Sequence, residues 1–230
     1  MADVHPPVEQ YLETILELEE SGIVPLRARL VERLGVSAPA VSETVARLER
    51  EGYLALDGER VIRLSDSGRS FGTTIMRRHR LAERLLTDVL GVPWSDVHVE
   101  ACRLEHAISG TLEEVLVAKL GDPGTCPHGN PIPGSRNSVD HGPLVPLTAL
   151  GTGAVAVVRR IDEALEVQTD RMRELQAAGC MPGAKVTVST ADGGMIVTGE
   201  TGATVTLTGR LAALVFVSDA VLAARTVTAP

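Results

Sequence analysis

Two segments of the chain carry side chains that could hold a divalent metal ion. In the first, His79 and Glu83 lie four residues apart. The second carries His98, Cys102, Glu105 and His106. Residues three or four apart share one face of a helix, so each set forms a single stripe if its segment is helical. Imidazole, carboxylate and thiol groups are ligands of transition metals, and the sequence therefore predicts a metal site between two helices.

Each of these residues also has an ordinary role. A single histidine is often a surface or hydrogen-bonded residue, a single cysteine is often a small buried apolar side chain, and a glutamate is often a solvated carboxylate. These roles fit poorly when the residues are taken together, because the spacings place all of them on facing helical stripes. We therefore favour the metal site.

Three helices are expected to position these groups. The segment Ser65–Gly68 can cap a helix that runs through Leu90 and ends at residues 91–93, which are Gly-Val-Pro. A second helix is expected from 94 to 109, and it carries most of the candidate ligands. A third is expected from 111 to 120.

The preceding residues predict a DNA-binding domain. Apolar residues at helical spacing indicate a first helix that begins after Pro6-Pro7 and ends near Gly22. A second helix follows Pro25, and Gly35-Val-Ser37 can end it and cap a third helix that runs to Glu51. Residues 54–64 form two extended runs around an Asp-Gly turn, which is a strong hairpin signal. Three helices and a hairpin predict a winged helix-turn-helix, which places its recognition helix in the major groove.

The recognition helix should meet base edges with its first turn and its solvent face, and basic residues around it should contact phosphates. The candidates for base edges are Ser37, Pro39, Ala40, Ser42 and Glu43. The candidates for the backbone are Arg27, Ala28, Arg29, Arg47, Arg50 and the wing residue Arg60. Any single arginine could instead be a solvated partner of Glu32, Glu49 or Glu59. The hairpin lies where a wing belongs, so the motif as a whole favours DNA binding.

Composition bounds the class of protein. The chain has 230 residues, 44% of them hydrophobic and only 2% aromatic, so its core must be aliphatic. It has no apolar run long enough to span a membrane, its first residues do not resemble a signal peptide, and its three cysteines do not suggest a disulfide framework. A cytoplasmic protein is expected. The formal net charge of −8 opposes DNA binding, so DNA binding requires clustered arginines and carboxylates that a metal could neutralise.

The last part of the chain predicts a linker and a small β-barrel. Residues 121–146 are rich in Gly, Pro and Asn and show no periodicity. Within them Cys126-Pro-His128 could bind metal, but no second pair lies nearby, so we expect it to belong to the linker. Short apolar runs between 145 and 227 alternate with turns, and one helix is expected over 169–178.

Several motifs together resemble the diphtheria toxin repressor family, and within it the actinobacterial iron-dependent regulators. The resemblance is dense over residues 8–134 and loose beyond them. The motifs are Tyr11-Leu-Glu-Thr-Ile15, Pro25-Leu-Arg-Ala-Arg29, Val41-Ser-Glu-Thr-Val-Ala-Arg-Leu-Glu-Arg50, Arg78-His-Arg-Leu-Ala-Glu-Arg84, Val97-His-Val-Glu-Ala-Cys-Arg-Leu-Glu-His106 and Gly129-Asn-Pro-Ile-Pro-Gly134.

The resemblance implies a primary and an ancillary metal site in each subunit. The primary ligands would be Gln10, Cys102, Glu105 and His106. The ancillary ligands would be His79, Glu83 and His98, with Gln168 from the barrel. The second barrel position of the family falls on Arg171, which cannot ligate a metal because it carries a fixed positive charge.

Departures from the family pattern affect the metal and the operator. Gln10 stands where iron-responsive members carry methionine, and its amide oxygen is a harder ligand, which favours Mn(II) or Fe(II) over softer ions. Manganese-responsive relatives use carboxylates at that position and where Cys102 stands, so the chain combines features of both. Glu43 and Ala40 replace a glutamine and a threonine of the iron regulators, so we expect a changed base preference.

The sequence therefore predicts an α+β protein and not an enzyme. It comprises a winged helix-turn-helix domain (1–72), a helical metal-binding and dimerisation domain (73–120), a linker (121–146) and an SH3-like β-barrel (147–230). The expected function is repression of iron-uptake and homeostasis genes by a homodimer that binds Fe(II) or Mn(II) and a palindromic double-stranded operator, with the number of dimers per operator left open. The alternatives are a manganese-responsive repressor, a metallohydrolase and a metal-independent regulator with a small-molecule pocket.

Overall fold

The structure is a computed structural model that describes residues 8–219. The chain forms two compact units, residues 1–78 and 79–230. The predicted start of the first helix at Pro6-Pro7 and the last part of the predicted barrel domain, residues 220–230, lie outside the described residues.

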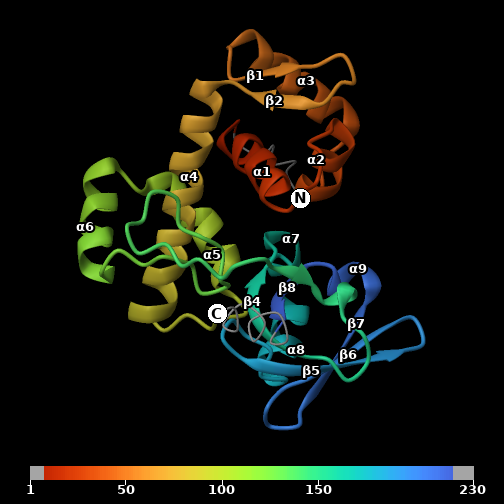
Figure 1. Cartoon of the computed structure of the whole chain (residues 1–230). Coiled ribbons are helices and arrows are strands. Elements are labelled where there is room, and N and C mark those ends of the chain that lie inside the picture. The colour runs from red at the N-terminus through yellow and green to blue at the C-terminus, as the bar shows by residue number, and fades with distance from the viewer. Residues whose placement is uncertain (1–7, 220–230) are drawn as a thin grey trace, which may run out of the picture. The chain divides into compact units, whose positions relative to one another are not determined.

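The first unit is a winged helix-turn-helix, as predicted (Figure 1). Its elements are α1 (Val8–Glu20), α2 (Arg27–Leu34), α3 (Ala38–Arg50), β1 (Leu54–Leu56) and β2 (Ile62–Leu64). Gly35 adopts a left-handed φ of 65° and ends α2, and the Ser37 hydroxyl accepts a hydrogen bond from the amide of Ala40 and caps α3. The two strands pair antiparallel, with Leu54 opposite Leu64. Aliphatic side chains from the three helices and both strands form its core together with Tyr11.

The helices of the second unit carry the predicted ligands. They are α4 (Asp66–Arg84, which begins in the first unit), a π-helical turn η1 (Leu85–Val89), α5 (Val97–Leu104), a 3-10 turn η2 (Glu105–Ala107) and α6 (Gly110–Leu120). The helix expected through Leu90 is thus π-helical in its last turn, and the helix expected from 94 to 109 starts later and tightens at Glu105. A small aliphatic core that includes Ala82, Val97 and Leu116 joins α4, α5 and α6.

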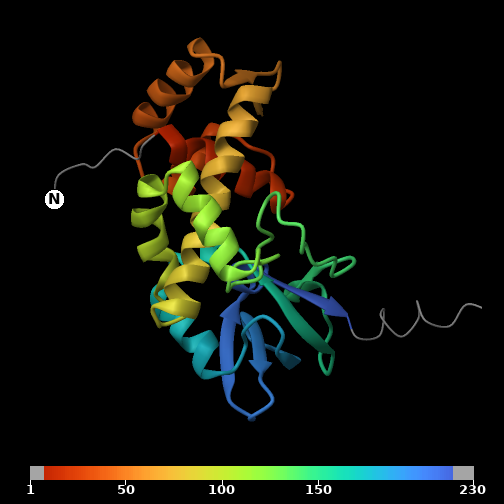
Figure 2. The same ribbon diagram turned by 90° about the vertical axis from the view of Figure 1, so that its left-hand side faces the viewer.

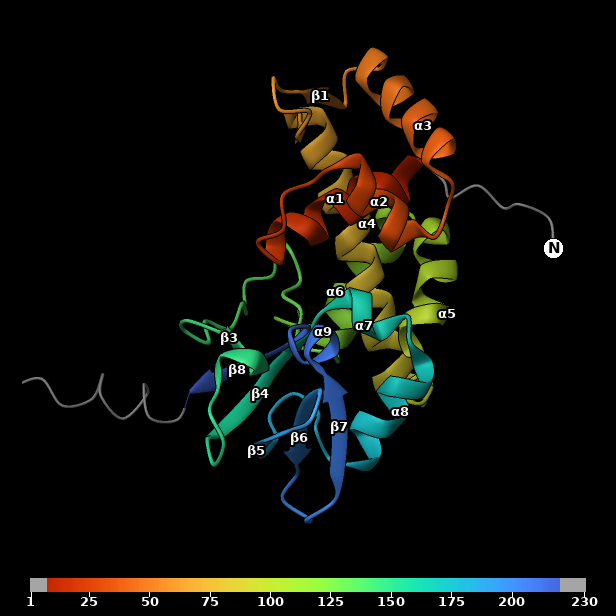
Figure 3. The same cartoon turned by 90° about the vertical axis from the view of Figure 1, so that its right-hand side faces the viewer.

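The remainder of the second unit is a six-stranded antiparallel sheet in the order β3-β8-β4-β5-β6-β7 (Figure 3). The strands are β3 (Val145–Pro146), β4 (Val155–Ile161), β5 (Lys185–Ala191), β6 (Gly194–Thr198), β7 (Thr204–Thr208) and β8 (Val215–Asp219). The interspersed helices are η3 (Leu147–Ala149), α7 (Glu163–Glu166), α8 (Thr169–Ala177) and α9 (Gly209–Ala212). Alternate residues of β4 and β5 are buried, which gives the barrel its core.

Most of the predicted barrel strands and the helix α8 are present close to their expected positions. The sequence analysis did not predict α7, which directly follows β4. Asp162 caps α7 by accepting a hydrogen bond from the amide of Ala164 (2.9 Å). This short helix matters because it supplies carboxylates to the site described next.

Candidate metal centre

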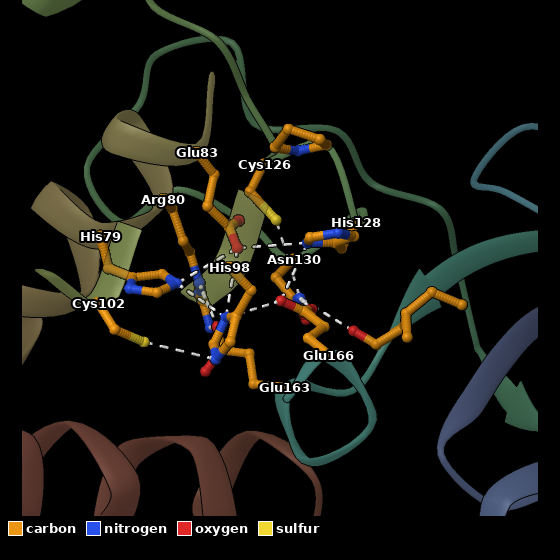
Figure 4. Close-up of polar contacts among 12 residues, drawn as sticks. His79, Arg80, Glu83, His98, Cys102, Cys126, His128, Asn130, Glu163 and Glu166 are labelled. Atoms are coloured by element: carbon orange, nitrogen blue, oxygen red, sulfur yellow. Dashed lines mark hydrogen bonds and ion pairs between the residues drawn. The ribbon is translucent and has the colours of Figure 1, made fainter. Parts of the chain in front are cut away.

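The predicted ligands of α4 and α5 do meet, as the facing-stripe argument requires (Figure 4). His79 and Glu83 on α4 are buried, as is His98 on α5. His79 Nε2 lies 3.3 Å from Glu83 Oε1 and 3.1 Å from His98 Nδ1. On the other side of its ring, His98 Nε2 lies 3.6 Å from the Cys102 sulfur.

The loop between α6 and β3 also contributes to the cluster. The expectation that Cys126-Pro-His128 belongs to a plain linker is wrong, because Cys126 and His128 are both fully buried. Ligand atoms of Glu83, Cys126 and His128 all lie within 4.8 Å of one another. The other candidate ligands of this group come from segments far from this loop in the sequence, α4 and α7.

The barrel contributes Glu166 rather than Gln168. Glu166 on α7 is 1% exposed, and its carboxylate forms a further candidate ligand group with Glu83 and His98. Gln168 lies beyond the end of α7, is exposed, and donates to the carbonyl oxygen of Ala164 (3.4 Å). The structure therefore does not bring Gln168 to the cluster. Gln168 follows Glu166 by two residues, and at that point the chain has already left α7, the helix that faces the cluster. Arg171 pairs with Glu174 on α8.

The contacts of His128 show why a cation fits this group. The Nε2–H of His128 donates to the carbonyl oxygen of Trp94 (3.0 Å), which leaves Nδ1 with a lone pair when the ring is neutral. Nδ1 lies 2.9 Å from Glu166 Oε2 and 3.2 Å from Glu83 Oε1, both of which are acceptors. His128 Nδ1, Glu166 Oε2 and Glu83 Oε2 are buried and have no hydrogen-bond partner among the described residues. Buried acceptor atoms that face one another require a proton or a metal cation between them.

A second group lies around the turn η2. Glu105 is buried, with Oε2 2.6 Å from His79 Nδ1 and Oε1 3.2 Å from His106 Nε2. His106 is 30% exposed, and Cys102 is partly exposed. Glu105 and His106 are therefore in contact on η2, whereas Cys102, on the last turn of α5, contacts His98. Gln10, the fourth predicted ligand of that site, lies half-buried on α1 in the first unit.

Comparisons with known proteins identify the family of the chain. A family model described as "Iron dependent repressor, N-terminal DNA binding domain" matches residues 3–62, and one described as "Iron dependent repressor, metal binding and dimerisation domain" matches residues 65–134. A FeoA domain model matches residues 145–219. The Mycobacterium tuberculosis iron-dependent repressor IdeR is 44% identical over 203 residues, which cover 84% of this chain and 88% of the relative. The chain belongs to the iron-dependent repressor family.

Other relatives extend this result. The diphtheria toxin repressor of Corynebacterium diphtheriae is 40% identical over 200 residues, 84% of this chain and 88% of that protein. A manganese-dependent transcriptional repressor in complex with manganese superposes with a TM-score of 0.80 at 34% identity and covers 93% of this chain and 100% of that chain. The manganese regulator SloR gives a TM-score of 0.75 at 26% identity, with 93% and 99% covered. Family membership makes the chain a DNA-binding repressor and excludes the metallohydrolase alternative.

The electrostatics of the repressor's cluster follow from burial and opposite charge. Burial alone would lower the pKa of His128, but the carboxylates of Glu166 and Glu83 raise its pKa well above the ordinary value. Burial would likewise raise the pKa of Glu83, yet His128 and His79 hold that pKa well below its usual range. The cluster thus strongly favours positive charge beside its carboxylates, whether from protons or from a metal.

The two thiols of the cluster differ in their tendency to ionise. Burial raises the pKa of Cys102, but the charge of His98 and hydrogen bonds with both His79 and His98 outweigh burial and lower the pKa to about 6. Burial and the Glu83 carboxylate raise the pKa of Cys126 to about 11. Cys126 can therefore act as a thiolate ligand only beside a cation, whereas Cys102 is ready to bind one.

Side chains around the repressor's loop hold Cys126 and His128 in place. Arg84 on α4 donates from Nε to the carbonyl oxygen of Thr125 (2.7 Å) and from Nη2 to that of Cys126 (3.3 Å). The carbonyl oxygen of His128 accepts from the amide of Ile161 at the end of β4 (2.9 Å). The loop is thereby fixed to both the ligand-bearing helix and the barrel.

The predicted DNA-binding residues of the repressor surround α3. Ser37, Pro39 and Glu43 are exposed and Ala40 and Ser42 are partly exposed. Ala28, Arg29, Arg47, Arg50 and Arg60 are exposed, and Arg27 is partly exposed. Arg29 pairs with Glu32 (2.8 Å), as the alternative interpretation allowed, but Glu49 accepts from the amide of Leu56 in the wing. Among residues 8–219, no helix is long and apolar enough to cross a membrane.

Proposed function

We propose that the protein is a homodimeric repressor of metal-uptake and homeostasis genes, which acts in the cytoplasm and binds a palindromic operator when divalent metal fills its buried cluster. The observation that carries this proposal is the buried meeting of His128 Nδ1 with the carboxylates of Glu83 and Glu166. These acceptor atoms call for a cation, and they lie in a chain that also has a winged helix-turn-helix. Sensing a metal ion and binding DNA are thus combined in one protein.

Two metal sites per subunit are proposed. The first uses Glu83, Cys126, His128 and Glu166, with His98 at its edge; it replaces the ancillary set that included Gln168. The second uses Cys102, Glu105 and His106, with Gln10 from α1 as its fourth ligand. Support for the first comes from the burial and mutual distances of its residues, and support for the second comes from the contact between Glu105 and His106.

The donor atoms favour Fe(II) or Mn(II). Carboxylate, amide and imidazole groups suit both ions, whereas the thiols of Cys102 and Cys126 favour iron over manganese. The names of the relatives mention iron for some and manganese for others. The chain therefore combines donor groups that suit each of these two ions.

Activation would depend on residues that tie separate elements together. When bound, the cation supplies positive charge that holds ligands from different elements in place. As a ligand, Gln10 would fix α1 to the turn that carries Glu105, and with it the position of the recognition helix α3. Because two recognition helices must be spaced by about one DNA turn, fixing α1 in each subunit would favour the operator-bound form. Glu83, Glu105 and Glu166 would also lose their net repulsion of phosphate.

On DNA, the exposed start of α3 would meet base edges. Pro39 and Ala40 can contact thymine methyl groups, and Glu43 can accept from a cytosine amine, with Ser37 and Ser42 alongside. The arginines at positions 27, 29, 47, 50 and 60, with Ala28 between the first two, would lie along the phosphates. Binding to phosphates should weaken as salt concentration rises.

The test is operator binding by the pure protein under anaerobic conditions. DNA from upstream of its own gene is titrated with protein in the presence of Fe(II), Mn(II) or a chelator. We expect binding only with metal, and the ion that acts at the lower concentration identifies the sensor as one for iron or for manganese. Tight binding in chelator would instead select the metal-independent alternative.

Variants locate the response. Cys102→Ala and Glu105→Ala should abolish metal-dependent DNA binding, and Glu166→Gln should weaken metal binding at the first site. Cys180→Ala is the matched control, because Cys180 is a buried thiol of the barrel core and belongs to neither candidate site. Unchanged activation by metal in Cys102→Ala and Glu105→Ala would overturn the assignment of the second site.

A further inference from the structure

Trp94 is the one tryptophan of the chain, and the metal sites proposed above do not use it. It lies in the turn between η1 and α5, among the helices that carry the ligands. Its side chain is nevertheless buried in the core of the barrel, with 8% of its surface exposed. Every other hydrophobic residue of that core lies between 145 and 217. A single indole from the helical part therefore completes the packing of the barrel.

Two contacts join this turn to the barrel, and they differ in strength. Burial of an aromatic side chain removes about 150–250 Å² of surface from water. Two residues after Trp94, Asp96 accepts a hydrogen bond from Arg173 on α8 (2.7 Å). The side chains of Asp96 and Arg173 are 32% and 57% exposed, and ion pairs exposed to water contribute little to stability. The buried indole, and not the ion pair, is therefore the main attachment of the barrel to this turn.

Trp94 also holds the loop that carries Cys126 and His128. Its indole Nε1–H donates to the carbonyl oxygen of Pro127 (3.0 Å), and its own carbonyl oxygen accepts from the Nε2–H of His128 (3.0 Å). The indole and the imidazole ring of His128 meet edge to face, with their centroids 4.8 Å apart. One residue thus binds two successive residues of the loop through a donor, an acceptor and a ring.

The hydrogen bond to the Trp94 carbonyl oxygen orients the imidazole ring of His128. Because Nε2 faces Trp94, Nδ1 is the nitrogen that faces Glu83 and Glu166 (Figure 4). A histidine that binds a metal is usually oriented in this way, by the partner of its other ring nitrogen. Trp94 therefore determines which nitrogen of His128 is available to a cation.

We propose that Trp94 is the anchor that docks the barrel on the helices of the second unit, and that through this docking it positions His128. The positioning role rests on the proposed function, in which His128 is a ligand of the first metal site. The anchoring role needs no metal. Loss of the indole should loosen both the barrel and the loop that carries His128, whereas loss of another residue of the barrel core should loosen the barrel alone.

The first experiment measures hydrogen–deuterium exchange of the full chain, prepared metal-free and reduced, by mass spectrometry of its peptides. Trp94→Ala should speed exchange over residues 122–134 and at the amide of Ile161, which donates to the carbonyl oxygen of His128. Trp94→Phe keeps a buried ring and should retain most of this protection. Leu207→Ala is the matched control, because Leu207 is fully buried in the same core but lies on β7. It should leave the loop protected.

The wild-type protein offers a measurement that needs no substitution. Trp94 is the only tryptophan, so tryptophan fluorescence reports this one side chain. Acrylamide should quench it much less in the folded, metal-free protein than in the urea-unfolded protein, because the indole is buried in the barrel core. Equal quenching in the two states would overturn the anchor, even if Trp94→Ala fails to fold.

The second experiment tests the positioning of His128 with metal ions. In a Cys102→Ala background, the sulfur-to-cobalt charge-transfer band reports ligation by Cys126, and titration with Co(II) gives the affinity. Trp94→Ala should weaken Co(II) binding by about 10- to 100-fold, as expected when a supporting residue of a metal site is lost. Trp94→Phe should lose less, and Leu207→Ala should bind Co(II) as the parent does.

Nuclear magnetic resonance of the Zn(II)-loaded protein, labelled with ¹⁵N at histidine, identifies the nitrogen that binds the metal. His128 should bind Zn(II) through Nδ1 and keep a slowly exchanging proton on Nε2, because that proton is donated to the Trp94 carbonyl oxygen. In Trp94→Ala this proton should exchange faster. Loss of barrel stability alone, as in Leu207→Ala, should not change it.

The outcomes separate the inference from the site on which part of it rests. Unchanged exchange of the loop in Trp94→Ala, or an equal increase in Leu207→Ala, overturns the anchor. Unchanged Co(II) affinity in His128→Ala overturns the first metal site, and the exchange measurement then decides on the anchor by itself. If His128→Ala weakens Co(II) binding but Trp94→Ala does not, the positioning role of Trp94 is overturned.

Discussion

His98 uses both of its ring nitrogens within the cluster. Nδ1 lies 3.1 Å from Glu166 Oε2, which belongs to the first proposed site. Nε2 lies 3.6 Å from the sulfur of Cys102, which belongs to the second. A single imidazole therefore lies between the two ligand groups, so the two sites are expected to influence each other.

Replacing His98 by alanine should lower metal occupancy at both sites. His106→Ala is the comparison, because His106 contacts Glu105 at the second site and should affect that site alone. Metal content per subunit after equilibration with a limiting concentration of Mn(II), measured by mass spectrometry of the eluted protein, distinguishes the two variants. Equal losses in His98→Ala and His106→Ala would contradict a shared imidazole.

The sequence predicted only part of this residue-scale pattern. His79, Glu83, His98 and Cys102 could be predicted because helical periodicity places them on facing stripes. The sequence could not predict the roles of Cys126, His128 and Glu166. Each lies in a segment without periodicity, and each becomes a candidate ligand only through contacts with residues that are distant in the sequence. Gln168 was chosen by its position in the family pattern, whereas the short helix α7 presents Glu166 two residues earlier.

Asp57 provides a prediction of pH dependence in the wing. Its Oδ1 accepts from the amides of Val61 (2.9 Å) and Glu59 (3.0 Å), and Oδ2 accepts from Arg63. The hydrogen bond from Val61 is the largest influence on the carboxyl, and with the bonds from Glu59 and Arg63 it holds the pKa of Asp57 below its ordinary value. When the pKa of a carboxyl is lower in the folded state than in the unfolded state, the ionised carboxylate adds to the free energy of unfolding at pH values above the unfolded-state pKa. That contribution is lost as the pH falls through the folded-state pKa.

Asp57→Asn should therefore lower the free energy of unfolding at pH 7 by an amount that stays constant down to about pH 5. Below about pH 4 the difference from the wild-type protein should shrink, because the wild-type carboxyl also becomes neutral. Urea denaturation of both proteins across this pH range measures their free energies of unfolding. A difference that does not change with pH would show that the carboxylate charge is not what stabilises the wing.

At the level of elements, the loop that carries Cys126 and His128 is shaped by Gly129. Gly129 has a φ of +88°, and a Cβ atom there would lie 1.9 Å from the carbonyl oxygen of Arg159 on β4. Only glycine allows the loop to lie this close to the barrel strand. The position of His128 therefore depends on a residue that has no chemistry of its own.

Gly129→Ala should lower the free energy of unfolding by about 2 kcal/mol or more, because it combines a positive φ with a backbone collision. It should also weaken metal binding at the first site by displacing His128. Gly193→Ala is the matched control, since Gly193 has a φ of +82° but open space around it, and it should cost only about 1 kcal/mol. Equal effects of the two substitutions would mean that backbone conformation, and not the contact with β4, accounts for the cost.

Elements differ in how far the sequence predicts them, for a physical reason. The helices α1 and α3 and the wing have amphipathic patterns and capping or turn residues that act locally. The turns η1 and η2 follow helical patterns, and the sequence does not show where the hydrogen bonding changes to π or 3-10. The helix α7 has only four residues, too few for a period, and it exists because Asp162 caps it and Leu165 packs in the barrel core.

At the scale of the whole molecule, α6 indicates how subunits associate. The helix is apolar on most of its faces, yet Leu112 and Val115 are 40% and 48% exposed. Figure 2, viewed from the side on which α6 lies in Figure 1, shows α6 on the outside of the second unit. An apolar helix face of this kind is usually covered by a partner, and the family model that matches this segment is one for dimerisation.

Val115→Glu should therefore convert the homodimer to a monomer, which light scattering during gel filtration would measure. Val167→Glu is the control, because Val167 is a valine of similar exposure (56%) that lies beside α8 and not on α6. The monomeric variant should also lose most of its operator affinity, since one recognition helix reaches only half of a two-fold site. A Val115→Glu protein that remains dimeric would place the subunit interface elsewhere.

When one molecule binds both a metal ion and DNA, its affinities for the two ligands depend on each other. If the cation favours the DNA-binding arrangement, the operator must in turn raise the affinity for the cation by the same factor. Couplings of this kind are usually about 5- to 150-fold. The formal charge of −8 favours a positive coupling between metal and operator, because a bound cation neutralises carboxylates and so lowers the repulsion of phosphate.

The prediction is tested from both directions at one salt concentration. Fluorescence anisotropy gives the operator affinity with saturating Mn(II) and with chelator, and calorimetry gives the Mn(II) affinity of the free protein and of its operator complex. The two ratios should agree, and both should fall toward one in Glu105→Ala. If metal raises the affinity of the protein for the operator but the operator leaves the affinity for Mn(II) unchanged, the ion acts on the DNA or on assembly of the protein. In that case the ligand cluster of the second unit would not be the sensor that controls the recognition helices.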